Sequence, residues 1–287
     1  MSIERIAAPA PRVFYREYVA QDRPVILTDA VASWPARTSW SPEYFKEKFG
    51  HCKIKVEVLE RDQPSDPLYF LTQKKMDDSM TMADYITKTQ TMEPSGKLYM
   101  AQVPITKIIP ELQNDIAAFP YPIVFPHRVG NGQGLFWMGP AGCTSALHFD
   151  PYHNFYVQFW GRKKWVIFPK AQQDLLYVPS KLQMRHFSPI DFEAPDLAQY
   201  PKYAAASPIE LTLEPGETLF LPEGWVHYVE TVEFAIALSF FWCTWARTLS
   251  NLPRDLRLVS GYYAKHMLLD IGRSIGKALH LAPVSKA

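Results

Sequence analysis

Two residues with metal-ligand side chains, His148 and Asp150, lie two positions apart in the stretch TSALHFDPYHNFYVQFWGRKKWVIFP at 144–169. Side chains two positions apart on a β-strand point to the same face. A histidine and a carboxylate on one face, joined by a second histidine from elsewhere, form the three-ligand set that leaves open positions on a non-haem Fe(II). This stretch therefore predicts two of the three ligands of an iron site.

The third ligand is expected on a different strand. His-x-Asp alone is weak evidence, because a single histidine on a strand is more often structural. His227, in LPEGWVHYVE, lies in a separate predicted strand and supplies the missing imidazole. His153 is the rival ligand, but it follows Pro151 and departs from the alternation that aligns His148 with Asp150. We expect His153 at the rim of the pocket.

Lys163 follows a Gly-Arg turn inside a predicted hairpin, where a lysine either reaches solvent or points inward. Alternation does not decide between the two. An inward ammonium group needs an anion, because an unpaired buried charge is costly. A dicarboxylate cosubstrate would provide that anion, with Tyr99, Ser145 and Asn154 as candidate hydrogen-bond donors around it.

Aromatic residues are frequent in these predicted strands. Most of them are expected in the core, because strands of a barrel are rich in aromatic residues in any case. Trp137 and Trp242 are the two that we expect at the wall of the pocket.

The elements that must position these residues begin with short strands and helices. Residues 24–28 (PVILT), 53–60 (KIKVEVLE) and 97–102 (KLYMAQ) are typical of strands. Ser41-Pro42-Glu43 predicts the start of a helix that ends at Gly50, and Thr81 predicts the cap of a second helix that runs to about Thr89.

From Gly134 onward the pattern becomes mainly β. Strands are expected within 134–140, 145–150, 154–160 and 163–169, and residues 211–242 predict three or four more. Residues 171–208 form a polar, proline-rich excursion between these groups. Short strands at this spacing favour a barrel or a double-sheet jelly roll.

The last part of the chain, residues 246–287, has apolar residues at helical spacing. Such an amphipathic tail must bury its apolar face on its own barrel or on a second copy. We expect residues 1–245 to form the main domain and the tail to be a dimerisation element.

Composition excludes several classes of protein. The chain of 287 residues is 47% hydrophobic and 21% charged, which suits a globular domain. Its net charge of +1 gives no field that would attract nucleic acid or an anionic membrane. Three cysteines without paired spacing argue against disulfides and structural zinc. Without a leader pattern or a long apolar run, we expect a soluble, cytoplasmic protein.

Three long blocks of sequence carry a resemblance to a known family. They are RPVILTDAVASWPARTSWSPEYFKEKFG, GPAGCTSALHFDPYHNFYVQFWGRKKWVIFP, and EPGETLFLPEGWVHYV followed by ALSFFW. From about Arg23 to Trp242, the chain resembles the JmjC-type, cupin-like Fe(II)- and 2-oxoglutarate-dependent oxygenases, in the small branch that hydroxylates protein residues. The resemblance implies a double-stranded β-helix with flanking helices.

The resemblance also implies roles for individual residues. His148, Asp150 and His227 would hold Fe(II), and Lys163 would pair with the distal carboxylate of 2-oxoglutarate. Further cosubstrate contacts are implied for Tyr99, for Ser145 (or Thr144, if the alignment slips by one), for Asn154 and for Trp242 in the pocket wall. O2 would be the second cosubstrate, and the products would be succinate, CO2 and a hydroxylated C–H position.

The substrate is not fixed by these motifs. A protein or peptide side chain is the first expectation, and the acidic residues Glu223, Glu230 and Glu233, with Asp191, Glu193 and Asp196, favour a basic one. A solvated acidic face explains the same residues equally well. The alternatives are N-methyl demethylation, oxidation of a small molecule or biosynthetic peptide, and a non-catalytic cupin-like binding module.

Overall fold

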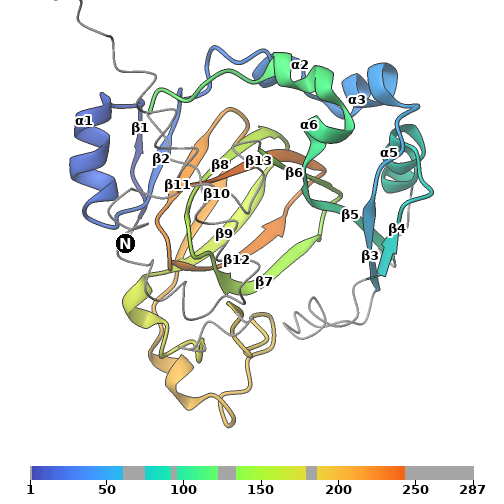
Figure 1. The fold of residues 1–287 in the computed structure, drawn as a ribbon. Coiled ribbons are helices and arrows are strands. Elements are labelled where there is room, and N and C mark those ends of the chain that lie inside the picture. Colours follow the sequence, from blue (N-terminus) through green and yellow to red (C-terminus); the bar gives the residue numbers. More distant parts are fainter. Residues whose placement is uncertain (1, 61–74, 92–95, 122–133, 179–185, 243–287) are drawn as a thin grey trace, which may run out of the picture.

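Two β-sheets that face each other form the centre of the molecule (Figure 1). The computed structural model describes residues 2–60, 75–91, 96–121, 134–178 and 186–242. Within these residues the chain is mainly β, with short helices. The predicted double-stranded β-helix of the jelly-roll type is therefore confirmed.

The larger sheet, called the major sheet here, has nine strands, and the minor sheet has four. In spatial order the major sheet contains β1 (Arg5–Ile6), β2 (Val25–Leu27), β11 (Thr218–Leu221), β8 (His153–Trp160), β13 (Ala235–Trp242), β6 (Leu135–Gly139), β5 (Gly96–Val103), β3 (Val56–Glu60) and β4 (Lys75–Asp77). The minor sheet contains β10 (Ile209–Leu213), β9 (Lys163–Phe168), β12 (Val226–Thr231) and β7 (Thr144–Phe149). The sequence predicts three or four strands within residues 211–242, and the structure has four in this part of the chain: β10, β11, β12 and β13.

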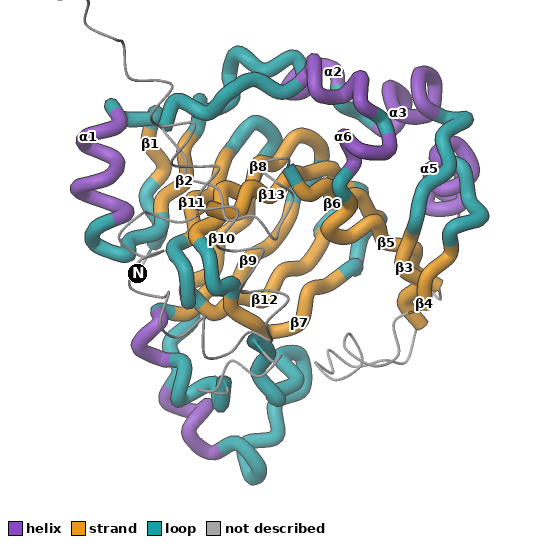
Figure 2. Tube along the Cα trace, in the orientation of Figure 1, coloured by secondary structure: helices purple, strands orange, loops and turns teal. Residues whose placement is uncertain are grey.

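The helices lie mainly in the N-terminal part of the chain and surround the major sheet (Figure 2). They are α1 (Pro11–Phe14), the π-helix η1 (Tyr15–Val19), α2 (Ala36–Ser39), α3 (Pro42–Phe49), α5 (Met82–Thr91), α6 (Ile105–Ile108) and the 3-10 helix η2 (Pro110–Asp115). Two short 3-10 helices, η4 (Lys170–Gln172) and η5 (Pro201–Ala205), belong to the excursion.

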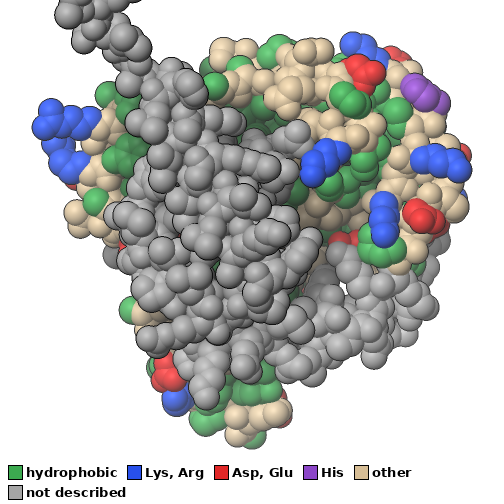
Figure 3. Space-filling view, viewed as in Figure 1, with side chains coloured by type: hydrophobic (Ala, Val, Ile, Leu, Met, Phe, Trp, Pro, Cys, Tyr) green, Lys and Arg blue, Asp and Glu red, His purple; other side chains and the backbone are tan. Residues whose placement is uncertain are grey.

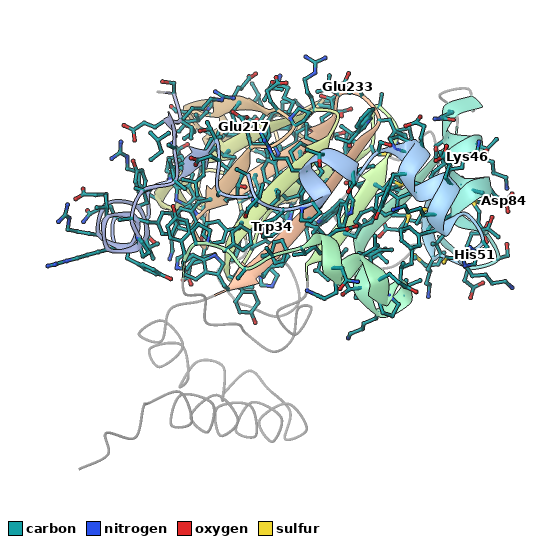
Figure 4. All side chains as sticks on the ribbon, turned by 90° about the horizontal axis from the view of Figure 1, so that it is seen from above. Trp34, Lys46, His51, Asp84, Glu217 and Glu233 are labelled. Atoms are coloured by element: carbon teal, nitrogen blue, oxygen red, sulfur yellow. The ribbon has the colours of Figure 1, made fainter. Side chains whose placement is uncertain are left out.

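Helix α3 shows how local sequence sets these boundaries. The Oγ atom of Ser41 accepts a hydrogen bond from the backbone N–H of Tyr44 at 3.1 Å, Pro42 occupies the first turn, and Gly50 follows the last residue. This is the predicted start and end, because a serine cap satisfies an N–H group that the first turn leaves without a partner. Figure 4 shows Lys46 of α3 and Asp84 of α5 at the end of the molecule away from α1.

Three groups of buried apolar side chains form the core. The first packs the helices and N-terminal loops onto the outer face of the major sheet, and it includes Phe14, Trp34 and Trp242. The second lies between the two sheets. The third lies on the outer face of the minor sheet beneath the excursion at 171–208. Because both faces of β8 and β13 are covered, these strands are buried almost throughout.

The described surface carries no single strong charge patch on the face in Figure 3, where acidic and basic side chains are interspersed. No helix within the described ranges is long and apolar enough to cross a membrane. The predicted helical tail, residues 246–287, lies outside the described residues.

Candidate metal and cosubstrate site

The three predicted ligands meet on the inner side of the minor sheet. Strands β12 and β7 pair antiparallel, with His227 directly opposite His148. A carboxylate oxygen of Asp150 lies 3.6 Å from Nε2 of His227, and its other oxygen lies 4.0 Å from Nε2 of His148. One ligand atom from each residue lies within 4.8 Å of the others. Two imidazole nitrogens and a carboxylate oxygen form a donor set suited to non-haem Fe(II).

A hydrogen bond to the backbone orients each of the two imidazoles and leaves its Nε2 atom available to bind a metal ion. Nδ1 of His148 lies 2.7 Å from the backbone carbonyl oxygen of Ala146, and Nδ1 of His227 lies 3.0 Å from that of Trp225. A carbonyl oxygen only accepts, so Nδ1 carries the proton in each ring. The unprotonated Nε2 atoms are therefore the free ligand atoms, which is how ligating histidines are usually oriented.

Burial shifts the acid–base properties of all three groups. It lowers the pKa of His148 to about 4 and that of His227 well below its usual value, because both imidazolium ions would lose hydration. For the same reason, burial raises the pKa of Asp150 to about 7. Neutral imidazoles bind metal directly, and a dication beside Asp150 would restore its ionised form.

A β-bulge in β7 brings a further residue into the same cavity. Opposite β12, His227 pairs with His148 and Val229 pairs with Ser145, so three steps on β7 match two on β12. Strict alternation would place Ser145 and His148 on opposite faces, but the extra residue in β7 turns both inward. Both residues line one cavity, together with Asp150.

Lys163 points inward into this cavity, which the sequence pattern did not decide. Its side chain is buried, and Nζ donates a hydrogen bond to the hydroxyl of Tyr99 at 2.7 Å. Nζ also lies 5.1–5.8 Å from the ring centroids of Tyr99, Trp137 and Tyr156. No carboxylate among the described residues pairs with this ammonium group, and burial lowers the pKa of Lys163 to about 7.

Several buried polar atoms at the cavity have no hydrogen-bond partner within the described ranges. They are Oη of Tyr156, Oδ1 of Asn154 and Nε1 of Trp165. Unsatisfied buried polar atoms are rare in folded proteins and cost about 1–3 kcal/mol each. The hydroxyl of Tyr156 and the indole N–H of Trp165 can donate hydrogen bonds. Together with Lys163, these two donors fit a small anionic molecule with several oxygen atoms, and 2-oxoglutarate has this chemistry.

The remaining predicted residues are placed as follows. Tyr99, Ser145, Asn154 and Trp137 line the cavity, whereas Thr144 and Trp242 do not. Trp242 lies in the core, where its ring stacks on Phe155 with centroids 5.4 Å apart.

His153 also differs from its expected position. We expected it at the rim of the pocket, but it is 1% exposed and lies against Trp242 with ring centroids 4.7 Å apart. Its Nδ1 accepts a hydrogen bond from the backbone N–H of Glu223 at 3.1 Å. His153 precedes Asn154 in β8, and Asn154 lines the cavity, so alternation along the strand directs His153 to the opposite face of the major sheet, away from the candidate ligands.

Gln102 lines the cavity and was missed by the sequence analysis. It lies in β5 beyond Tyr99, and a register shift between Met100 and Val103 brings both residues onto the cavity side. Its φ angle is +55°, a left-handed conformation that is uncommon for residues other than glycine. A glutamine inside a strand pattern gives no sign of this conformation.

Comparison with known proteins agrees with this geometry. A family model described as a cupin-like domain matches residues 10–247. Lysine-specific demethylase 8 from Xenopus tropicalis is 31% identical over 241 residues, which cover 84% of this chain and 53% of that protein. Lysine-specific demethylase JMJ30 from Arabidopsis thaliana is 32% identical over 242 residues, covering 83% and 54%.

A third relative is similar over most of its own length. The human bifunctional peptidase and (3S)-lysyl hydroxylase JMJD7 is 26% identical over 264 residues, covering 82% of this chain and 81% of that protein. In contrast, this chain spans only about half the length of the two demethylases.

Fold and site together define a double-stranded β-helix protein with a His-Asp-His metal-binding triad. The chain belongs to the JmjC-type, cupin-like family of oxygenases. Enzymes of this family use Fe(II), 2-oxoglutarate and O2, and the residues around the cavity fit the first two.

Proposed function

We propose that this chain is an Fe(II)- and 2-oxoglutarate-dependent dioxygenase that hydroxylates an unactivated C–H bond on a side chain of a protein or peptide. The observation that carries the proposal is one cavity that contains both the His148, Asp150 and His227 set and the buried ammonium group of Lys163. A non-catalytic cupin-like module would need neither the three ligands nor a buried cation without a counter-charge.

Each residue has a distinct task in the proposed reaction. His148, Asp150 and His227 hold the metal from one side and leave its other positions open. When bound, Fe(II) and 2-oxoglutarate activate O2, and the reaction yields succinate, CO2 and a hydroxylated product. Lys163, oriented by Tyr99, binds the distal carboxylate of the cosubstrate.

Other polar residues complete the proposed cosubstrate pocket. Ser145 and Asn154 lie on the cavity wall as hydrogen-bonding partners for the remaining oxygen atoms. The aromatic rings around Lys163 exclude water, which strengthens the pairing of the ammonium group with an anion.

A lysine-type side chain is the substrate that we propose first. Support comes from the relatives, because two are named lysine-specific demethylases and one is named a lysyl hydroxylase. Hydroxylation of an N-methyl group would lead to demethylation. Demethylation at the same site is therefore the alternative reaction. A small molecule or a biosynthetic peptide is the second alternative.

Glu223, Glu230 and Glu233 do not support a basic substrate side chain, although the sequence analysis named them in its favour. Glu233 pairs with Arg162 at 2.9 Å on the surface, and Glu223 is buried with its carboxylate 3.8 Å from Nζ of Lys170. Glu230 lies in β12 one position from Val229, which faces the cavity, and therefore lies on the opposite face. None of the three lines the cavity.

The excursion residues are engaged in local contacts of their own. Glu193 accepts a hydrogen bond from the hydroxyl of Tyr228, and the carboxylates of Asp191 and Asp196 accept bonds from nearby backbone N–H groups. We therefore base the proposed substrate on the relatives rather than on these carboxylates.

Succinate formation from 2-oxoglutarate, with Fe(II) and ascorbate, tests the proposal. The wild-type protein should form succinate, and His148→Ala should not. Incubation with cell extract should then add the mass of one oxygen atom to a lysine-containing peptide. Loss of a methyl group would identify the demethylase alternative, and a modified metabolite would identify the small-molecule alternative. If the protein forms no succinate and binds no metal, the non-catalytic binding module is favoured.

We also propose that residues 250–287 contribute to a homodimer. The only support is their amphipathic sequence pattern, since they lie outside the described residues. A dimeric mass in solution that becomes monomeric after truncation at Asn251 is the expected result. A full-length chain that is monomeric at micromolar concentration would contradict it.

A further inference from the structure

Residues 186–188 of the excursion run alongside β7 as a short added edge strand. The backbone N–H of Phe149 donates to the carbonyl oxygen of His186 at 2.9 Å, and that of Ser188 donates to the carbonyl oxygen of Leu147 at 2.8 Å. These bonds place Phe187 opposite His148 in an antiparallel bridge. The edge strand β7, which carries His148 and ends just before Asp150, is thus covered by residues 186–188 of the excursion.

The side chain of Phe187 stacks on the imidazole of His148. The ring centroids are 5.1 Å apart, and the ring planes differ by 26°. The hydrogen bond from Nδ1 to Ala146 directs Nε2 of the same imidazole. A flat ring against the imidazole adds a second constraint, because it limits rotation about the Cβ–Cγ bond.

The position of the segment does not depend on the Phe187 ring. Ser188 is fully buried, and its Oγ donates to the carbonyl oxygen of Leu176 at 2.6 Å and accepts from the N–H of Ile190 at 3.1 Å. The two backbone bonds to β7 also involve no side chain. Removing the ring should therefore leave the added strand paired with β7.

We propose that Phe187 is a positioning residue for the metal site: its ring fixes the plane of the His148 imidazole and shields that ligand from water. This inference rests on the proposed function, in which His148 binds Fe(II). Its consequence is that the metal affinity depends on Phe187 of the excursion, although none of the excursion residues that the structure describes belongs to the proposed ligand set. The described parts of the excursion, residues 171–178 and 186–208, lie below the sheets in Figure 1, and Phe187 bridges to β7.

The affinity for a metal ion, measured in the absence of turnover, tests this role. Mn(II) is the probe because it is stable to oxidation, and electron paramagnetic resonance measures its binding. Phe187→Ala should weaken Mn(II) binding about 3- to 10-fold, as expected for the loss of a partner that orients a ligand. Phe187→Tyr retains the ring and should bind within about two-fold of wild type.

Phe192→Ala is the matched control. Phe192 belongs to the same excursion, but its ring stacks on Tyr228 at 4.4 Å and not on a proposed ligand. Both alanine variants should lower the melting temperature, whereas only Phe187→Ala should change the Mn(II) affinity. Equal Mn(II) binding by wild type and Phe187→Ala, or equal weakening by both alanine variants, would overturn the inference alone. A wild-type protein that binds neither Mn(II) nor Fe(II) would overturn the proposed function and this inference with it.

Discussion

His227 on β12 lies directly opposite His148 on β7, and the centroids of their imidazole rings are 4.2 Å apart. Two residues far apart in sequence become neighbours because two antiparallel strands of the minor sheet share one register. A slip of one residue would turn one of the imidazoles to the outer face, so the metal site depends on this register. The bulge in β7, between Ser145 and His148, then adds Ser145 to the same side.

The buried ammonium group of Lys163 should make the stability of the ligand-free protein depend on pH. Its pKa falls from 10.5 to about 7 in the folded state, so above pH 7 the unfolded chain binds more protons. Stability should therefore rise from about pH 7 to about pH 9, below the range in which tyrosines titrate. Lys163→Met should remove this rise and stabilise the ligand-free fold at pH 7, as measured by thermal unfolding.

Lys164→Met is the control for that experiment. The side chain of Lys164 is partly exposed and pairs with Glu210 at 2.8 Å on the outer face of the minor sheet. An exposed pair contributes at most about 1 kcal/mol, and the pH dependence should remain. If Lys163→Met retained the wild-type pH dependence, the buried ammonium group of Lys163 would not be its cause, and this prediction would be wrong.

Ser145 and Thr144 offer a direct test of the bulge in β7. Ser145→Ala should raise the KM for 2-oxoglutarate about ten-fold, because it removes a hydrogen bond to a charged ligand. Thr144→Ala should leave this KM unchanged, since Thr144 does not line the cavity. Steady-state succinate formation measures both, and a larger effect at Thr144 would mean that the register is shifted by one residue.

Gln102→Gly should stabilise the fold by about 0.5–1 kcal/mol, because glycine adopts the φ angle of +55° at this position without the steric cost of a side chain. Chemical denaturation measures the free energy of unfolding. Gln113→Gly, in the 3-10 helix η2, should destabilise the protein by a similar amount. A loss of stability at both positions would contradict the left-handed conformation of Gln102.

Alternation in the sequence was sufficient to place His148 and Asp150 on one face, and the serine cap and glycine were sufficient to bound α3. The long, specific blocks of sequence were sufficient to indicate the family and its fold. These features are local, or they repeat over many residues, so the sequence records them directly.

The direction of Lys163 and the choice between Ser145 and Thr144 could not be predicted in the same way. Both depend on how β9 and β7 pair with β12, and a bulge adds one residue to a strand without a mark in the composition. Trp242 was expected at the pocket wall, but its ring packs in the core beside His153. Alternation gives the two faces of a strand, but it does not tell which face meets the cavity when both are buried.

Anaerobic titration with Fe(II) and 2-oxoglutarate tests the central claim most directly, because direct chelation of the iron by the keto acid produces a visible charge-transfer absorption. Wild type should show this absorption only when both are present, with one Fe(II) per chain. His51→Ala should behave in the same way, because His51 is exposed, does not line the cavity, and lies at the end of the molecule that carries Lys46 and Asp84 (Figure 4). His148→Ala should show none. No absorption in wild type, or an undiminished absorption in His148→Ala, would contradict the account.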